Sequence, residues 1–134
     1  MKLRNETAEI FVPDGVPVRD ALARVTHVGI GAHQDDLEFM AFHGIMECFH
    51  SREGWFGGIT CTNGAGSART GAYASFSDAE MRGVRREEQR SAAIVGRYGV
   101  MAQLDYPSAA VKDPAAGDLK ADILALVLQT RATA

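Results

Sequence analysis

The chain has 134 residues, enough for one domain with a single sizeable core. Its formal net charge is −3, and without a basic stripe nucleic acid is not expected as a main partner. No apolar run approaches the roughly 18 residues that a membrane span needs, the N-terminus lacks the apolar core of a signal peptide, and two cysteines make no disulfide framework, so we expect a cytoplasmic protein.

Strands and helices are predicted to alternate along the chain. Residues 9–13 are typical of a short edge strand, and 18–25 of one or two helical turns. The near-continuous apolar run over 25–32 predicts a parallel strand covered on both faces. An amphipathic helix over 36–52 and a second strand over 55–62 follow.

A loop rich in Gly and Ser, over 63–77, is expected to border a binding site, and its composition is equally compatible with a plain surface loop. The long helix after it begins near Ser77 or Asp78, both good N-caps, and ends at Gly99. The residues predicted for its inner face are Met81, Val84, Ala92 and Val95.

A third strand over 100–107 and a last helix over 118–132 complete the pattern. One stripe of that helix is predicted to carry Leu119, Ile123, Leu126 and Val127. The repeated strand-helix order implies right-handed crossovers and a parallel sheet. We therefore expect one α/β domain over 1–134: a three-layer, doubly wound, Rossmann-like, mostly parallel sheet with helices on both faces. Ligands bind beyond the carboxyl ends of the strands in such folds.

Polar residues follow the first buried strand where it ends. His33 and Asp36 lie three residues apart across a strand-to-helix turn, so they can converge on one point. Imidazole plus carboxylate is a ligand set that suits Zn²⁺. The carboxylate of Asp35 would then face a metal-bound water and could take its proton. The alternative is a core or capping histidine at position 33, with Asp36 as a helix N-cap.

The stretch GAHQDDLEF resembles the AHPDDxE signature of the PIG-L/LmbE-like family of metal-dependent N-deacetylases, which act on N-acetylglucosamine-type substrates. Further likenesses follow in order along the chain: ITCTNGAGS after the second strand, VRREEQRSAAIVGRYGV in the long helix, and QLDYP at the end of the third strand. The resemblance covers residues 25–130. It implies that His33 and Asp36 bind zinc, that Asp35 is the general base, and that Arg85 and Asn63 contact the substrate.

Several positions have a second interpretation. Gln34 stands where the family has proline, which predicts a looser turn. Arg85 could instead pair with Glu88 one helical turn on. Glu38 matches the acid of the signature but is expected to be a first-turn helix acid. His43 and His50 are expected to be surface or packing residues.

The family completes its zinc site with a later histidine, after a fourth strand. No histidine follows His50 in this sequence, so zinc would have two protein ligands here in place of the usual three. Either the chain is a fragment of a longer protein, or the third ligand comes from elsewhere, or the activity is lost. We expect the chain to be the N-terminal portion of a larger deacetylase domain, because a helix such as the one over 118–132 is normally followed by another strand in this architecture.

The leading hypothesis is a zinc-dependent amide hydrolase that removes an acetyl group from an N-acylated amino sugar or related small molecule. One alternative is a domain that binds Mg²⁺ and a phosphorylated ligand through the strand-end acids. The other is a catalytically inactive domain. The oligomeric state, including a homo-oligomer, stays open.

Overall fold

A four-stranded sheet in the order β1-β4-β3-β2 lies at the centre of the computed structural model, which describes all residues from 1 to 134. Three strands are parallel: β2 (His27–Gly31), β3 (Phe56–Thr62) and β4 (Val100–Tyr106). The short β1 (Glu9–Phe11) pairs antiparallel with β4, which confirms the predicted edge strand. The fold is therefore mixed α/β with a mostly parallel sheet.

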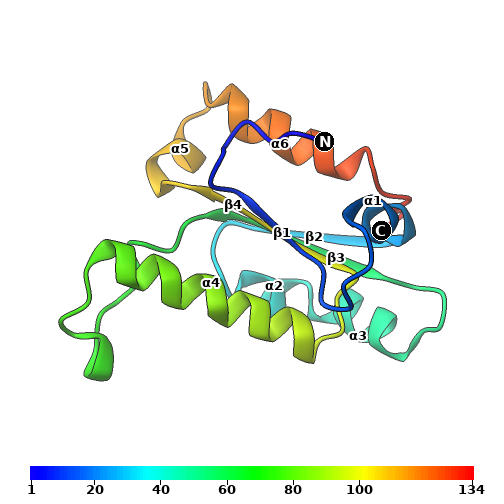
Figure 1. Ribbon diagram of the computed structural model, residues 1–134, viewed down its shortest axis with the longest axis horizontal. Coiled ribbons are helices and arrows are strands. Elements are labelled where there is room, and N and C mark those ends of the chain that lie inside the picture. The colour runs from blue at the N-terminus through cyan, green and yellow to red at the C-terminus, as the bar shows by residue number, and fades with distance from the viewer.

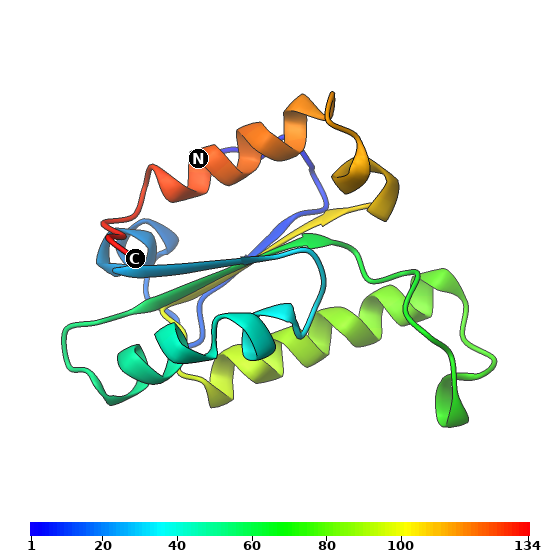
Figure 2. The ribbon, with the colours of Figure 1, turned by 180° about the vertical axis from the view of Figure 1, so that it is seen from behind.

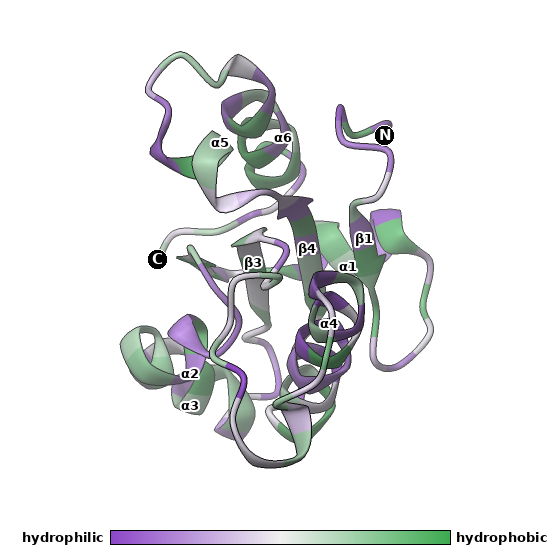
Figure 3. Cartoon of the chain, turned by 90° about the vertical axis from the view of Figure 1, so that its left-hand side faces the viewer, coloured by the Kyte–Doolittle hydropathy of each residue, from purple (hydrophilic) through white to green (hydrophobic).

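Helices cover both faces of this sheet, as Figures 1 and 2 show from opposite sides. One layer contains α1 (Val18–Arg24), α5 (Ser108–Lys112) and α6 (Gly117–Val127). The other contains α2 (Asp36–Met40), α3 (Phe42–His50) and α4 (Asp78–Val95). Figure 3 shows the two layers from the side, with hydrophilic turns on α4. None of the helices is long and apolar enough to cross a membrane.

The core has two parts because successive side chains of a strand point to opposite faces of the sheet. Between the sheet and the layer of α1 and α6, buried residues include Leu22, Ile59, Leu104 and Leu126. Between the sheet and the layer of α2, α3 and α4, they include Leu37, Ile45, Phe56, Tyr98 and Met101. Every residue of β3 is buried, so the loop over 63–77 extends from a strand that is enclosed on both faces.

The prediction that the first parallel strand is covered on both faces was wrong. β2 lies at the edge of the sheet, and Ile30 is 47% exposed. The last residues of the chain run along the outer side of β2, where the Val28 N–H donates to the carbonyl of Ala134 (2.9 Å). These contacts do not extend to Ile30.

The helix predicted over 36–52 is broken in two. Ala41 ends α2 with φ −107° and ψ 15°, and α3 begins at the next residue. The break redirects the chain so that Leu37 in α2 and Ile45 in α3 both reach the sheet. It also leaves α2 as a short separate element at the carboxyl end of β2.

The long helix begins as predicted, with Ser77 as N-cap and a capping box completed by Glu80. Its predicted end at Gly99 was wrong, since Gly96 is the C-cap. The inner-face prediction was wrong for Val95, which is 77% exposed, because Tyr98 folds back and packs against Phe56 in its place. The fully buried residues of this helix are Met81, Gln89 and Ala93. Two of its predicted contacts, Val84 and Ala92, are half-buried.

The last helix is shorter than predicted, since α6 ends at Val127. Its apolar stripe is confirmed, because Leu119 and Leu126 are buried and Ile123 and Val127 are half-buried. The short α5, which the sequence did not predict, follows Pro107 at the exit of β4.

Asp105, at the end of β4, holds α4 against the sheet. Its buried carboxylate pairs with Arg82 and Arg86 of that helix. Burial alone would raise the pKa of Asp105, but the hydrogen bonds from Arg82 and Thr7 and the charges of the two arginines outweigh burial and lower it. Because α4 carries Arg85 and other site residues, this ion pair also positions the site.

Asp105→Asn is expected to lower the free energy of unfolding at pH 7 by about 2 kcal/mol, since both arginines lose their counterion but remain partly hydrated. Asparagine tolerates the φ of 63° at this position. A carboxyl with a lowered folded pKa stabilises above its unfolded pKa of about 3.9, and this contribution is lost as the pH falls through the folded pKa. Urea unfolding from pH 7 to pH 3 should show the two proteins converging. A constant difference would contradict the assignment.

Candidate functional site

The turn after β2 brings four polar residues together at the carboxyl end of the strand. Gly31 allows the turn to fold back closely, since a Cβ there would lie 2.8 Å from the Cβ of Asp36. The His33 N–H donates to Oδ2 of Asp36 (2.8 Å), which closes the turn. Asp35 adopts a left-handed conformation with φ 77°, which costs a residue other than glycine about 1 kcal/mol or more.

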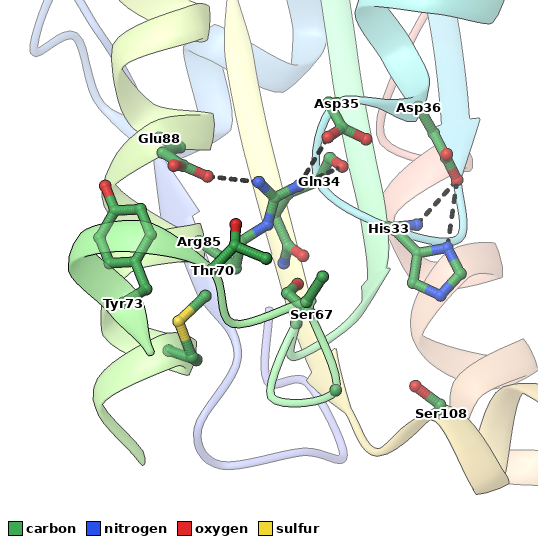
Figure 4. A pocket seen from close by; sticks show the side chains of 14 residues that line it. His33, Gln34, Asp35, Asp36, Ser67, Thr70, Tyr73, Arg85, Glu88 and Ser108 are labelled. Atoms are coloured by element: carbon green, nitrogen blue, oxygen red, sulfur yellow. Dashed lines mark hydrogen bonds and ion pairs between the residues drawn. The ribbon is translucent and has the colours of Figure 1, made fainter. Parts of the chain in front are cut away.

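A pocket of about 530 Å³ opens beside this turn. Figure 4 shows His33 and Asp36 on one side of it and Arg85 and Glu88 on the other, with Asp35 between them. The residues that line it are His33, Gln34, Asp35, Asp36, Gly64, Gly66, Ser67, Ala68, Thr70, Tyr73, Met81, Arg85, Glu88 and Ser108. The lining is therefore mostly polar, and six of its members come from the loop over 63–77, as expected for a loop that borders the site.

His33 and Asp36, the predicted metal ligands, lie side by side. The His33 Nδ1 is 3.7 Å from Oδ2 of Asp36, and the two side chains are 56% and 25% exposed. Two ligand atoms on one tetrahedral zinc ion are about 3.3 Å apart. The pair is thus close to the spacing that a shared cation requires and is accessible from the pocket.

These residues fit two of the three protein ligands that a catalytic zinc ion usually has. No group of three or more His, Cys, Asp or Glu side chains in residues 1–134 is spaced to hold a metal ion. The interpretation of Asp36 as the helix N-cap was wrong, because Asp35 is the N-cap of α2 and Asp36 is the first residue of that helix. The carboxylate of Asp36 instead accepts the His33 N–H before the helix. That bond engages Oδ2 and leaves Oδ1 without a hydrogen-bond partner in the protein.

Asp35, the predicted general base, points one carboxylate oxygen at Arg85 of α4. The Arg85 Nη2 donates to Oδ2 of Asp35 (2.7 Å), while Oδ1 makes no hydrogen bond to the protein. The side chain of Asp35 is 55% exposed, so this second oxygen is open to the pocket. Arg85 therefore orients the carboxylate through one oxygen and leaves the other oxygen free.

Arg85 makes contacts that correspond to both interpretations. It lines the pocket, and it pairs with Glu88 one turn on. Burial alone would lower the pKa of Arg85, but the hydrogen bond to Asp35 and the charge of Glu88 outweigh burial and raise it, so the guanidinium stays charged. Arg85 also donates to the carbonyl of Gln34 (2.7 Å), so the same side chain holds the backbone of the turn.

Gln34 does not leave the turn loose, contrary to the expectation from its place in the motif. The side chain is 3% exposed, and its Nε2 donates to the carbonyl of Thr62 at the end of β3 (2.9 Å). Gly64, with φ 70°, allows this contact, because a Cβ there would lie 2.7 Å from Oε1 of Gln34. Glutamine thus supplies a tether between two strand ends that proline has no group to make.

Asn63 is not among the residues that line the pocket. Its Oδ1 accepts the backbone N–H of Ala65 (3.1 Å) and so shapes the first turn of the loop after β3. Its predicted contact with substrate stays a prediction. The prediction for His43 and His50 is confirmed, since both are exposed. Cys48 and Cys61 are buried free thiols, and burial raises the pKa of each.

Two groups near the turn were missed in the sequence. Gln89 is 1% exposed and accepts the Asp35 N–H, and Tyr98 donates to Glu38 (2.7 Å), which in the sequence reads as a simple helix acid. The spacing in the sequence could have indicated Gln89, because it follows Arg85 by four residues and so lies on the same face of the helix.

Comparisons with protein-family models, with curated proteins and with solved structures found no match to this chain.

Proposed function

We propose that the protein is a metal-dependent amide hydrolase that removes an acetyl group from an N-acylated amino sugar or a related small molecule. The observation that carries the proposal is the convergence of His33, Asp36 and Asp35 on one polar pocket at the carboxyl end of a parallel strand. The likeness of GAHQDDLEF to the N-deacetylase signature gives the reaction type.

His33 and Asp36 would hold the Zn²⁺, together with a third ligand that residues 1–134 do not supply beside them. Bound there, zinc would supply Lewis acidity for the acyl carbonyl and for the attacking water. Asp35 would accept the proton of the attacking water through its free Oδ1 and would pass that proton to the amine that leaves. Arg85 holds the other oxygen of Asp35, so the base keeps its direction through the reaction.

The polar lining of the pocket is compatible with the proposed substrate class. Ser67, Thr70 and Ser108 offer hydroxyl groups around the pocket, which suits a small hydroxyl-rich ligand. We also expect a doubly wound, Rossmann-like sheet and a cytoplasmic location, as the sequence predicts.

The proposal predicts that the protein, loaded with one equivalent of Zn²⁺, releases acetate from an N-acetylglucosamine conjugate. A chelator should abolish the release, and added Zn²⁺ should restore it. Release of the free amine, measured by mass spectrometry, gives an independent readout. Protein that binds no metal would overturn the proposal. Binding of Mg²⁺ with no transition metal would favour the phosphorylated-ligand alternative.

A further inference from the structure

One peptide unit of the turn is held on both sides by the same helix. The carbonyl of Gln34 accepts from Arg85 Nη2 (2.7 Å), and the N–H of Asp35 donates to Oε1 of Gln89 (3.1 Å). These are the two ends of a single peptide plane. Arg85 and Gln89 are four residues apart on α4, so they present both groups from one helix face.

This peptide decides where the Asp35 carboxylate points. Rotation of a peptide plane changes ψ of the residue before it and φ of the residue after it. The left-handed φ of 77° at Asp35 is disfavoured for a residue with a side chain, so an unrestrained peptide would rotate away from it. A cavity of about 110 Å³ adjoins Gln34, Asp35 and Gln89, so packing alone does not prevent that rotation.

The amide of Gln89 is itself fixed in one orientation. Its Nε2 donates to Oε1 of Glu38 (2.9 Å), and a carboxylate can only accept. The Oε1 of Gln89 must therefore face the Asp35 N–H. Tyr98 donates its hydroxyl to the same Glu38 oxygen (2.7 Å), and burial together with Glu38 raises the pKa of Tyr98, so the hydroxyl stays protonated.

We propose that Gln89, oriented by Glu38 and Tyr98, is a positioning residue that holds the Gln34–Asp35 peptide so that Asp35 faces the pocket. Three hydrogen bonds connect the core to the site. Tyr98 and Gln89 both donate to Glu38, and the Asp35 N–H donates to Gln89. The catalytic consequence rests on the proposed function, because it requires Asp35 to be the base. The restraint on the peptide does not.

Gln89→Met keeps the size of the side chain but removes the amide. Hydrogen exchange at the Asp35 N–H, followed by NMR, is expected to become at least about tenfold faster in this variant. The kcat for acetate release should fall by about 10- to 100-fold with KM within about twofold, since a misdirected base slows the chemical step and leaves binding intact. The affinity for Zn²⁺ should not change, because His33 and Asp36 are retained.

A charge-conserving exchange tests the direction of the hydrogen bonds. Gln89→Glu alone places two carboxylates face to face and should also release the Asp35 N–H. The double variant Glu38→Gln with Gln89→Glu restores a donor between them, and its new carboxylate still accepts from Asp35. It should recover both the protection of the Asp35 N–H and kcat.

Gln103→Met is the matched control. Gln103 is an equally buried glutamine, on β4, and its Nε2 donates to the Arg86 carbonyl away from the turn. Its loss should reduce stability without changing exchange at Asp35. Wild-type protection of the Asp35 N–H in Gln89→Met would overturn the proposal, and so would equal loss in Gln103→Met. If the wild-type protein releases no acetate, the proposed function fails, and exchange alone decides this inference.

Discussion

Asp35→Asn is expected to reduce acetate release by at least about 100-fold, because a positioned general base contributes about 10²- to 10⁴-fold to rate. The substitution removes the proton acceptor and little else. Asparagine tolerates a positive φ, and its amide oxygen can still accept from Arg85. The fold and the metal affinity should therefore be retained, and kcat should carry the loss.

The measurement is acetate release at saturating substrate with the variant loaded with Zn²⁺. Asp20→Asn is a suitable control, since Asp20 is an exposed residue on α1 in the opposite helix layer. It should retain wild-type activity. If the wild-type protein is active and Asp35→Asn is equally active, Asp35 is not the base.

His33→Ala is expected to weaken Zn²⁺ binding by at least about 100-fold, because it removes one of the two ligands that lie together. The free energy of unfolding should change by less than about 0.5 kcal/mol, since the side chain is 56% exposed and the turn is closed by the backbone N–H of His33 rather than by its ring. Competition with a chromophoric chelator measures the affinity.

His43→Ala provides the matched control, because His43 is an exposed histidine of α3 that does not line the pocket. It should bind Zn²⁺ as the wild-type protein does. Equal affinity in His33→Ala and the wild-type protein would place the metal elsewhere. Equal loss in both histidine variants would point to nonspecific surface binding.

Local patterns predicted most of the elements. The apolar run before His33 and the amphipathic stretches after it have the periods of strands and helices, which depend on neighbours in sequence. Ser77 was one of the two predicted caps because N-cap preference depends on residue type, and the capping box that it forms with Glu80 lies within four residues. The same locality predicted that His33, Asp35 and Asp36 follow the end of a strand, where they line the pocket of the candidate site.

The predictions that failed depend on distant parts of the chain. The apolar run of β2 suggests burial on both faces, but only the strand order shows that β2 is an edge strand with Ile30 exposed. Val95 continues the apolar pattern of its helix, yet Tyr98 takes its place against Phe56. Periodicity predicts which face is apolar and does not say what lies opposite it.

The sequence by itself determined which chemical groups stand at the end of β2, since four consecutive residues supply them. Only the tertiary structure decided the orientation of these groups toward the pocket. The Asp35 conformation depends on Arg85 and Gln89, some 50 residues further along, with Gln89 separated from it by 54 positions. A left-handed φ at an aspartate is unfavourable by local preference, so it persists only where distant hydrogen bonds restrain it.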